Sequence, residues 1–344
     1  MKIVYLPGDG IGPEVTDVCR AIIQKLTAQA GVNLQTEDHD FGGIAIDNHG
    51  DPLPKATLEA CQDSDAVFLG AVGGPKWDKG GPRPEAGLLG LRKALGLFAN
   101  LRPVAVQKGM EHLSPLKTER VAGADILIIR ELTGGMYFGE KKEGDEVASD
   151  LCIYSKEEVE RVARVAFEAA RKRRGLVTSI DKANVLASSR LWRKTVVALH
   201  EAEYSDVKLT HELVDAAAMK LIQAPTYYDV ILTENLFGDI LSDEASVIPG
   251  SIGLLGSASL GSGGPGLFEP IHGSAPDIAG QDKANPLGAV NSVSLMLRHG
   301  LDMPEAADRV DAAIAGALKD GETTPDLGGY LTCSQLGEAL LARV

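Results

Sequence analysis

The segment that decides the fold reads Asn235-Leu236-Phe237-Gly238-Asp239-Ile240-Leu241-Ser242-Asp243. It follows the apolar run at residues 230–233, which predicts a strand that leads directly into a helix. On that helix Asp239 and Asp243 are four residues apart, so both carboxylates lie on one face. Two hard oxygen ligands about one turn apart suit Mg²⁺ or Mn²⁺ and leave coordination positions for substrate and water. A solvated helix face, with Asp243 near the cap, is the alternative that the spacing alone leaves open.

The bulk composition excludes several classes of protein. The chain has 344 residues, enough for one large core or two domains. Its formal net charge is −14, with 34 Lys and Arg against 48 Asp and Glu, which argues against a general nucleic-acid binder because such binding needs a basic face. The N-terminus enters a strand without a signal or transit segment, and no apolar run approaches membrane-spanning length.

The cysteines also bear on the compartment. Cys19, Cys61, Cys152 and Cys333 are scattered and share no metal-ligand spacing. They are typical of reduced thiols in a cytoplasmic protein. We therefore expect a cytoplasmic protein with neither a nucleic-acid nor a membrane partner.

Short apolar strands alternate with helical stretches, which predicts an α/β protein with a largely parallel sheet. Strands are predicted at residues 3–6, 66–72, 126–129, 177–180 and 230–233. The clearest helix spans residues 155–174, where Ser155 and Glu158 form a capping box and the basic run at 171–174 favours the helix dipole. Its apolar stripe consists of Val159, Val162, Ala163, Ala166, Phe167 and Ala170. The Gly-rich stretch at residues 256–266 is predicted to be the most mobile segment.

Polar residues follow three of the predicted strands. Arg130 comes after the strand at 126–129, Asp181 and Lys182 after the strand at 177–180, and Asn235 two residues after the strand at 230–233. In open α/β sheets, ligands bind at the carboxyl ends of the strands. These residues are therefore candidates for one site.

The stretch Gly8-Asp9-Gly10-Ile11-Gly12 has the spacing G-x-G-x-G and not the G-x-G-x-x-G of a dinucleotide-binding fingerprint. No acidic residue clearly ends a second strand about twenty residues further on. The pattern favours a tight turn from strand to helix, with Pro13 in the first helical turn. Phosphate binding at that helix N-terminus is the weaker interpretation.

Three arginines have settings that suit anion binding: Arg92, Arg102 and Arg130. The guanidinium fork matches a carboxylate bidentately, so several converging forks would suit a dicarboxylate. Each arginine taken alone is more often a surface or structural ion-pair residue.

Two further residues are candidates for proton transfer. A lysine near a divalent cation and arginines has a lowered pKa, so Lys182 could act as a base, although a solvated lysine is the plainer interpretation. Tyr137 could be a phenolic acid or a packed aromatic residue. The loop at residues 272–280 consists of small residues suited to a flat ligand, and Asp277 without a nearby cation favours NAD over a 2′-phosphorylated cofactor.

Together these segments resemble the β-decarboxylating dehydrogenase family, which includes isocitrate, isopropylmalate, homoisocitrate and tartrate/D-malate dehydrogenases. The resemblance runs from Met1 to the C-terminal region over at least six separate motifs. It implies an α/β fold with an open, mostly parallel sheet in two domains, distinct from a Rossmann fold. Residues 1–98 and 250–344 would form a discontinuous cofactor-binding domain. Residues 99–249 would carry the metal site, the substrate site and the dimer interface.

The family resemblance also implies roles for individual residues. Arg92, Arg102 and Arg130 would hold substrate carboxylates, and Lys182 and Tyr137 would be catalytic. The implied metal ligands are Asp215, Asp239 and Asp243. Asp215, which would also touch the substrate, and Lys182 would reach the site from the neighbouring subunit, giving a homodimer with shared active sites. The residues implied for NAD binding are Gly73, Gly74, Glu85, Glu269, His272, Gly273, Ser274, Ala275, Asp277, Ile278 and Asn285.

The choice of substrate depends on the loop at residues 85–89. Leu88 and Leu89, with Val185, predict an apolar pocket for an isopropyl group, where isocitrate enzymes present polar groups. Such a pocket separates alkyl groups by only about 1–3 kcal/mol per methylene, but it rejects a carboxylate more strongly because an unpaired charge would be desolvated. The implied reaction is oxidative decarboxylation of (2R,3S)-3-isopropylmalate to 4-methyl-2-oxopentanoate and CO₂, in leucine biosynthesis.

Two alternatives remain at this point. A D-malate or tartrate dehydrogenase would use the same machinery on a smaller substituent. A non-catalytic regulatory subunit of the family is the other, and the complete set of catalytic and metal-binding residues argues against it. One departure from the family concerns its protruding arm, here residues 140–154, where Asp150-Leu151-Cys152 replaces a more polar stretch.

Overall fold

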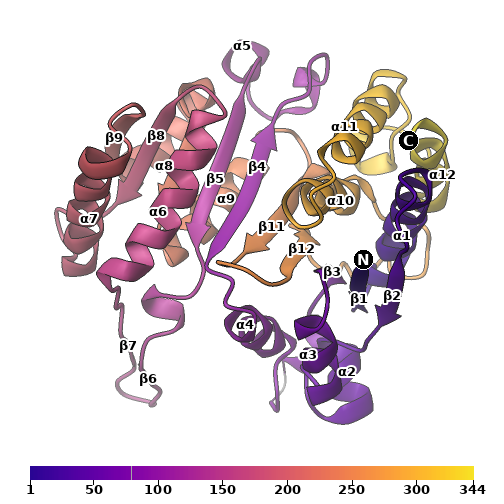
Figure 1. Cartoon of the computed structure of the whole chain (residues 1–344), viewed down its shortest axis with the longest axis horizontal. Helices are drawn as coiled ribbons and strands as arrows, with labels where there is room; N and C mark the ends of the chain where they lie inside the picture. The colour runs from indigo at the N-terminus through magenta and orange to yellow at the C-terminus, as the bar shows by residue number, and fades with distance from the viewer. Residues whose placement is uncertain (79) are drawn as a thin grey trace. The chain divides into compact units, whose positions relative to one another are not determined.

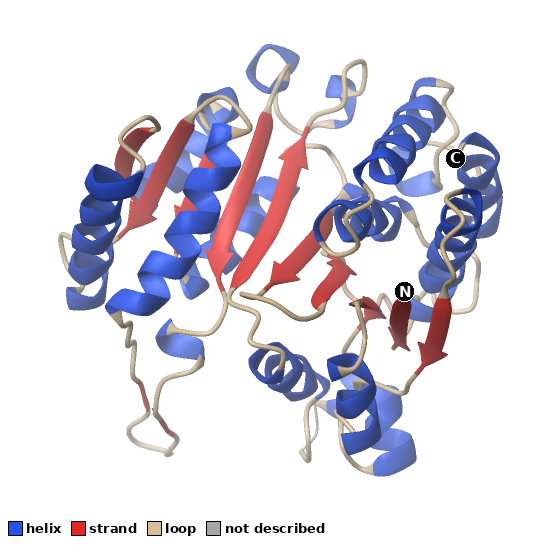
Figure 2. Cartoon of the chain, in the orientation of Figure 1, coloured by secondary structure: helices blue, strands red, loops and turns tan. Residues whose placement is uncertain are grey.

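The computed structural model describes residues 1–78 and 80–344, which divide into two compact units (Figure 1). Unit 1 comprises Met1–Leu97 and Ser251–Val344, and unit 2 comprises Phe98–Gly250. In each unit helices flank the strands, as the colouring of Figure 2 shows. The α/β class expected from the sequence is confirmed. No helix within the described ranges is both long enough and apolar enough to cross a membrane.

The strands of unit 1 follow the order β2, β1, β3, β12, β11. Their bounds are β1 Lys2–Gly8, β2 Gln35–Asp38, β3 Ala66–Ala71, β11 Gly256–Leu260 and β12 Gly266–Pro270. The pairs among β2, β1, β3 and β12 are parallel, and β11 runs antiparallel to β12. The helices are α1 Gly12–Gln29, α2 Gly43–His49, α3 Lys55–Gln62, α4 Pro84–Ala94, α10 Leu287–His299, α11 Pro304–Lys319 and α12 Cys333–Arg343.

Side chains of β1 alternate between two packed layers of unit 1. Tyr5 faces α1, since the Arg20 guanidinium lies 4.2 Å from its ring centroid. Val4 and Leu6 point the other way, into a buried cluster that includes Cys61 of α3 and Leu91 of α4. Side chains on both faces of the sheet are therefore buried, as is usual for a parallel sheet that helices cover on both sides.

Unit 2 repeats the plan with the strand order β4, β5, β10, β8, β9. The bounds are β4 Ala99–Ala105, β5 Asp125–Glu131, β8 Leu176–Asp181, β9 Lys208–Leu213 and β10 Val230–Thr233. Only β4 pairs antiparallel among these strands. The helices are α5 Thr118–Val121, α6 Lys156–Arg171, α7 Ala187–Glu203, α8 Val214–Gln223 and α9 Asn235–Ser246, and a small hairpin joins β6 Lys141–Lys142 to β7 Ser149–Asp150. Helix α6 lies in front of β5 in Figure 1, with α9 behind it.

The prediction for α6 is largely confirmed. Ser155 and Glu158 form the capping box, and all six residues of the predicted stripe are buried. The helix ends at Arg171, three residues earlier than predicted, because Gly175 adopts a left-handed conformation (φ 76°) and its N–H bonds back to Ala170. The basic residues beyond the helix serve structure: Arg173 donates to the buried Asp229 at 2.9 Å.

The stretch at residues 256–266, which the sequence predicted to be the most mobile, contains β11 and the first residue of β12. Strands β11 and β12 pair across this stretch, and Ala258, Leu267 and Phe268 are fully buried. The glycine at 256 is needed for close packing, since a Cβ there would lie 2.5 Å from the backbone nitrogen of Ser292 in α10. Small residues therefore mark a tight approach of helix and sheet.

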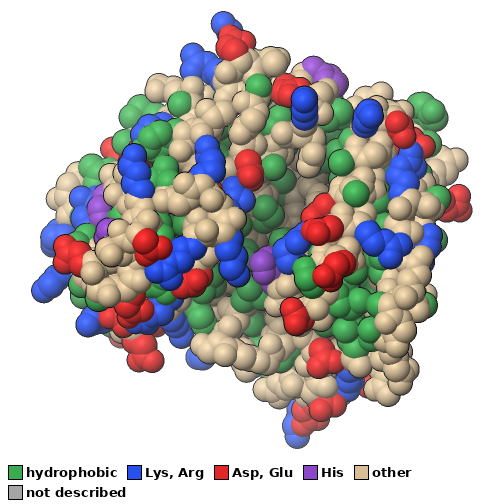
Figure 3. Space-filling view, turned by 45° about the horizontal axis from the view of Figure 1, so that its top comes forward, with side chains coloured by type: hydrophobic (Ala, Val, Ile, Leu, Met, Phe, Trp, Pro, Cys, Tyr) green, Lys and Arg blue, Asp and Glu red, His purple; other side chains and the backbone are tan. Residues whose placement is uncertain are grey.

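The sequence did not predict β2, and the expectation that no acidic residue ends a second strand is wrong, because β2 ends in Asp38. Its carboxylate forms an ion pair with Arg20 of α1, so it is engaged within the fold. Over the face drawn in Figure 3, acidic and basic side chains are interspersed.

Candidate functional site

Three parallel strands of unit 2 bring the predicted polar residues to one edge. The register places Thr233 of β10 between Arg130 of β5 and Ile180 of β8. The residues after these strand ends, among them Lys182 and Asn235, therefore start from the same edge of the sheet. This confirms the expectation that the strand ends converge.

Asp239 and Asp243 of α9 face a pair of buried arginines. Arg130 forms an ion pair with Asp239, and Arg102 donates to Asp243 Oδ1 at 3.1 Å. Both guanidiniums come from strands and are less than a tenth exposed. Because a buried cation is costly unless it is paired, the two carboxylates offset the charge of the arginines. The Tyr137 hydroxyl completes the cluster by donating to Asp239 Oδ2 at 2.8 Å.

Several residues that seat the arginines were not among the predicted site residues. Asn100 Oδ1 accepts from Arg102 Nε at 2.8 Å, and Ser242 Oγ accepts from Arg102 NH1 at 2.8 Å. Ser242 lies one turn from Asp239 on the same helix face, a spacing that could have revealed it. Asn100 is two residues from Arg102 on β4, so both side chains lie on one face of the strand, a spacing that could have revealed it too.

Asp215 is not beside the other two predicted metal ligands in this chain. Within residues 1–78 and 80–344, no three His, Cys, Asp or Glu side chains are placed to hold a metal ion. Asp215 instead accepts from Lys182 Nζ at 2.7 Å, and this contact lowers the pKa of Asp215. Asp239 and Asp243 nevertheless offer the hard, partly exposed carboxylate oxygens that Mg²⁺ or Mn²⁺ prefers. The donor set fits such an ion if one further carboxylate comes from elsewhere.

The turn after β8 fixes the backbone around Lys182. Asp181 is fully buried and takes both Nε and NH2 of Arg193, at 2.8 and 2.9 Å. The same carboxylate accepts from the backbone N–H of Ala183. Asp181 thus fixes the turn on both sides of Lys182, through its own ion pair with Arg193 and its hydrogen bond to Ala183, while the lysine side chain contacts the exposed Asp215.

Tyr137 lies in a short 3-10 helix, η3 (Gly135–Tyr137). Burial and the hydrogen bond to the Asp239 carboxylate raise the pKa of Tyr137 to about 12. The phenol is therefore protonated near neutral pH and can donate a proton.

In unit 1 the Gly8–Gly12 stretch forms the predicted strand-to-helix turn, and Asp9 at its centre is a structural anchor. The buried Asp9 carboxylate accepts from the backbone N–H groups of Gly43, Ile44 and Gly73, each at 2.8 Å. Burial raises the pKa of Asp9. These donors belong to the first turn of α2 and to the loop after β3, and not to the N-terminus of α1, so phosphate binding at α1 stays a prediction.

Gly73 is held from both sides. Asp9 accepts from its N–H, and Ser274 Oγ donates to its carbonyl at 2.6 Å. Gly73 and Gly74 both adopt positive φ, at 98° and 158°, and a Cβ on Gly73 would lie 2.6 Å from Glu85 Oε1. The structure thus brings together four of the residues predicted to bind NAD.

The other residues predicted to bind the substrate lie on separate elements. Arg92 of α4 is buried and forms an ion pair with Glu269 of β12 at 2.8 Å. Leu88 packs against the apolar core of the unit, so it contributes to folding as well as to any pocket, whereas Leu89 lies outside that cluster. Val185, in unit 2, is 61% exposed.

The loop after β12 carries the rest of the predicted cofactor residues, with Gly273, Asp277 and Ile278 at least partly accessible. Ala275 adopts an unusual φ of 38°. His272 has a buried Nε2 without a partner among the described residues, and burial lowers the pKa of His272. Asn285 donates to Asp326 at 3.0 Å. Asp326, which the sequence did not reveal, also accepts from Ser251 at 2.8 Å.

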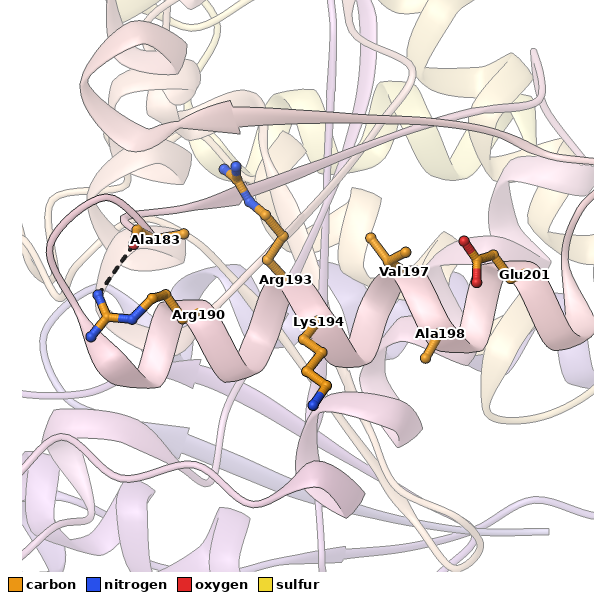
Figure 4. Close-up of a pocket in the computed structure, with 7 residues that line it drawn as sticks. All are labelled: Ala183, Arg190, Arg193, Lys194, Val197, Ala198 and Glu201. Atoms are coloured by element: carbon orange, nitrogen blue, oxygen red, sulfur yellow. Dashed lines mark hydrogen bonds between the residues drawn. The ribbon is translucent and has the colours of Figure 1, made fainter.

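A shallow groove runs along α7 in unit 2 (Figure 4). Its basic lining residues are Arg190, Arg193 and Lys194. Arg190 donates to the Ala183 carbonyl, drawn dashed in Figure 4, and Arg193 is held by Asp181. The two guanidiniums therefore stabilise the turn that carries Lys182.

Glu234, which directly precedes α9, is 5% exposed. Burial, with a smaller contribution from the charge of Glu131, raises the pKa of Glu234 to about 7. From pH 4.5 to 7 the unfolded chain releases this proton while the folded chain retains it, so stability falls as the pH rises. We expect Glu234→Gln to be more stable than wild type by roughly 3 kcal/mol at pH 8 and by less than about 1 kcal/mol at pH 5. Denaturant unfolding at both pH values measures this difference.

Glu338→Gln is the control for that measurement, because Glu338 is an exposed glutamate of α12. A Glu234→Gln effect that is the same at pH 5 and pH 8 would show that the carboxyl group does not titrate between them.

An open, mostly parallel α/β sheet with acidic and basic side chains past its strand ends defines an α/β enzyme whose ligands bind at those ends. The model of the isocitrate/isopropylmalate dehydrogenase family matches residues 2–340. The chain belongs to the isocitrate/isopropylmalate dehydrogenase family.

Similar proteins support this assignment along the whole chain. The chain is 58% identical to the 3-isopropylmalate dehydrogenase of Staphylococcus saprophyticus, covering 96% of each sequence. It is 54% identical to that of Oleidesulfovibrio alaskensis, covering 100% of this chain and 99% of the other. Among solved structures, the isocitrate dehydrogenase of Methylococcus capsulatus matches with a TM-score of 0.89 at 35% identity, covering 99% and 98% of the two chains.

Proposed function

We propose that the protein catalyses NAD-dependent oxidative decarboxylation of (2R,3S)-3-isopropylmalate to 4-methyl-2-oxopentanoate and CO₂, a step of leucine biosynthesis. The observation that carries this proposal is the cluster in which Arg102, Arg130 and Tyr137 meet Asp239 and Asp243. Relatives named 3-isopropylmalate dehydrogenase, at 58% and 54% identity, favour this substrate over isocitrate. The four cysteines, which are unpaired, fit a cytoplasmic enzyme.

The arginines supply the binding of a dicarboxylate. Arg102 and Arg130 are buried residues on strands, and in such a setting a charge-assisted hydrogen bond is stronger than in water. Arg92 supplies a further buried guanidinium, now paired with Glu269. Fixed forks orient the C2 hydroxyl and the C3 carboxylate of the substrate for reaction.

Asp239 and Asp243, with Asp215 of the partner subunit, would hold Mg²⁺ or Mn²⁺, and a bound ion supplies Lewis-acid polarisation of the substrate oxygens. NAD⁺ supplies the hydride acceptor. We assign its binding to the residues around Gly73 and the loop after β12, where Asp277 and Ile278 are not cationic and so favour NAD over a 2′-phosphorylated cofactor.

Two side chains of the protein move the protons. Lys182 of the partner subunit takes the proton of the C2 hydroxyl, directly or through water, as hydride leaves C2. After loss of CO₂ from the β-keto acid, Tyr137 donates a proton to C3. Its pKa of about 12 keeps it protonated for that task.

A homodimer with shared active sites completes the proposal. Asp215, Met219 and Ile222 recur at i, i+4 and i+7 on α8, and Met219 and Ile222 are exposed at 60% and 39%. Ile240 of α9 and Val247, which directly follows that helix, are likewise exposed. A second copy that covers this apolar face would bury the surface around Asp215 and bring the Asp215 carboxylate toward the partner subunit. In a two-fold symmetric dimer the same contact occurs twice, so each subunit would give its Asp215 to the other.

The test is NADH formation across a substrate panel. We expect 3-isopropylmalate to give the highest kcat/KM, with D-malate lower because it lacks the alkyl group that Leu89 and Val185 would contact, and isocitrate lowest because its extra carboxylate would be unpaired. Activity should vanish with excess EDTA, return with Mg²⁺ or Mn²⁺, and be much lower with NADP⁺. A higher kcat/KM for isocitrate or D-malate would overturn the substrate assignment, and full activity in EDTA would overturn the metal site.

A further inference from the structure

Asn235, the first residue of α9, occupies the centre of the cluster although the proposed reaction gives it no task. Its side chain is 1% exposed and lies between two parts of unit 2. The Oδ1 atom accepts from Nε and NH2 of Arg130 at 3.1 and 2.8 Å. The Nδ2 atom donates to the Gly134 carbonyl at 3.2 Å. The chemistry fixes this amide orientation, because a guanidinium only donates and a carbonyl only accepts.

The contact determines which way the Arg130 fork points. The Nε edge of the guanidinium is turned toward Asn235, so NH1 is directed to Asp239. The stem of Arg130 is confined too, since a Cβ at Gly238 would lie 2.6 Å from Arg130 Cγ. Asn235 and Gly238 are three residues apart on one face of α9 and together form a seat for the arginine.

The other side of Asn235 holds the segment that leads to Tyr137. Besides the Gly134 carbonyl, the segment is fixed by the buried Glu131, which accepts from the N–H groups of Thr133 and Gly134 at 2.9 and 2.7 Å. The hydroxyl of Tyr154 accepts from the backbone N–H of Asn235 at 3.0 Å, which satisfies a donor at the helix N-terminus. One side chain thus contacts both the arginine and the backbone before η3.

We infer that Asn235 is a positioning residue, which orients Arg130 for a substrate carboxylate and links that arginine to the segment carrying Tyr137. The inference rests on the proposed function, because Arg130 is assigned there to the substrate. A neutral amide suits this role better than a carboxylate, since Asp would offset the charge that attracts the substrate and could not donate to Gly134.

Asn235→Ala should raise KM for the hydroxy acid by roughly 10- to 100-fold, the effect of a lost hydrogen bond to a charged group, while KM for NAD⁺ stays within about threefold. Asn235→Asp should likewise raise KM for the hydroxy acid and leave KM for NAD⁺ nearly unchanged. Because it keeps the size of the side chain, this variant replaces Asn235→Ala in the test if the alanine variant does not fold. Asn291→Ala is the matched control: it loses an amide bond to the Leu254 carbonyl in unit 1 and should leave the KM for the hydroxy acid unchanged.

The decisive measurement is a double-mutant cycle with Arg130→Lys, which retains the charge and loses the fork. If Asn235 acts through Arg130, adding Asn235→Ala to Arg130→Lys should raise KM by no more than about twofold. The same fold-increase in both backgrounds, or equal rises in KM for hydroxy acid and NAD⁺, overturns the inference. The probe is whichever of 3-isopropylmalate and D-malate the wild type oxidises faster. If the substrate assignment is wrong, D-malate replaces 3-isopropylmalate in the assay, and the double-mutant cycle still measures the coupling between Asn235 and Arg130.

Discussion

Lys182→Met is expected to lower kcat for hydride transfer by about 10³-fold or more, the contribution of a well-placed general base. The methionine side chain fills similar space but has neither charge nor a proton-accepting nitrogen. Stopped-flow measurement of NADH formation gives the rate of this step directly. Lys194→Met makes the same change on an exposed lysine of α7 (Figure 4) and should retain wild-type kcat. A Lys182→Met enzyme within tenfold of wild type would exclude the lysine as the base.

The same variant tests whether the active sites are shared. In the proposed dimer, Lys182→Met disables the lysine given to the partner, whereas Asp239→Ala disables the metal site of its own subunit. In a mixed dimer one site receives both defects and the other receives neither. Mixing the two inactive proteins after dissociation should therefore restore part of the activity, up to one working site per mixed dimer. If subunit exchange is verified and no activity returns, each site is built from one chain.

Tyr137→Phe is expected to slow release of 4-methyl-2-oxopentanoate by about 10²–10⁴-fold while a burst of NADH persists, because only the later proton donor is lost. The ring and its contact with Arg130, 5.7 Å from the ring centroid to the guanidinium carbon, are kept. Single-turnover experiments that follow NADH and 4-methyl-2-oxopentanoate separately resolve the two steps. Tyr330→Phe, at an 83% exposed tyrosine, is the control. Equal slowing of NADH and 4-methyl-2-oxopentanoate formation would place Tyr137 at or before hydride transfer.

The sequence predicted the elements that are strongly periodic or strongly apolar. The capping box and stripe of α6, and the turn at β10 that opens α9 at Asn235, were confirmed because each depends on neighbours in the chain. The strands β11 and β12 in the Gly-rich stretch were not predicted. Gly256 allows the close approach of α10, and this contact joins residues that are distant in sequence. Strand β9 went unpredicted because its only apolar residues, Leu209 and Leu213, are separated by three polar residues and so do not alternate with them.

For the site, residue types were predictable and their partners were not. The i, i+4 spacing placed Asp239 and Asp243 on one face, and the sequence singled out Arg102 and Arg130 as anion binders. That these four form ion pairs depends on the register of β4 with β5. The role of Asp215 could not be predicted from contacts within one chain. Its carboxylate contacts Lys182, and the described residues of this chain place no three acidic, His or Cys side chains around a metal ion.

The anchor at Asp9 has a mechanical consequence for unit 1. One carboxylate binds the first turn of α2 and the backbone of Gly73, and a Cβ at Gly42 would also lie 2.9 Å from it. The loop at Gly73 and helix α2 consequently share an attachment point with no flexible spacer between them. When a ligand displaces one of these two segments, the other must travel with it as part of the same rigid piece.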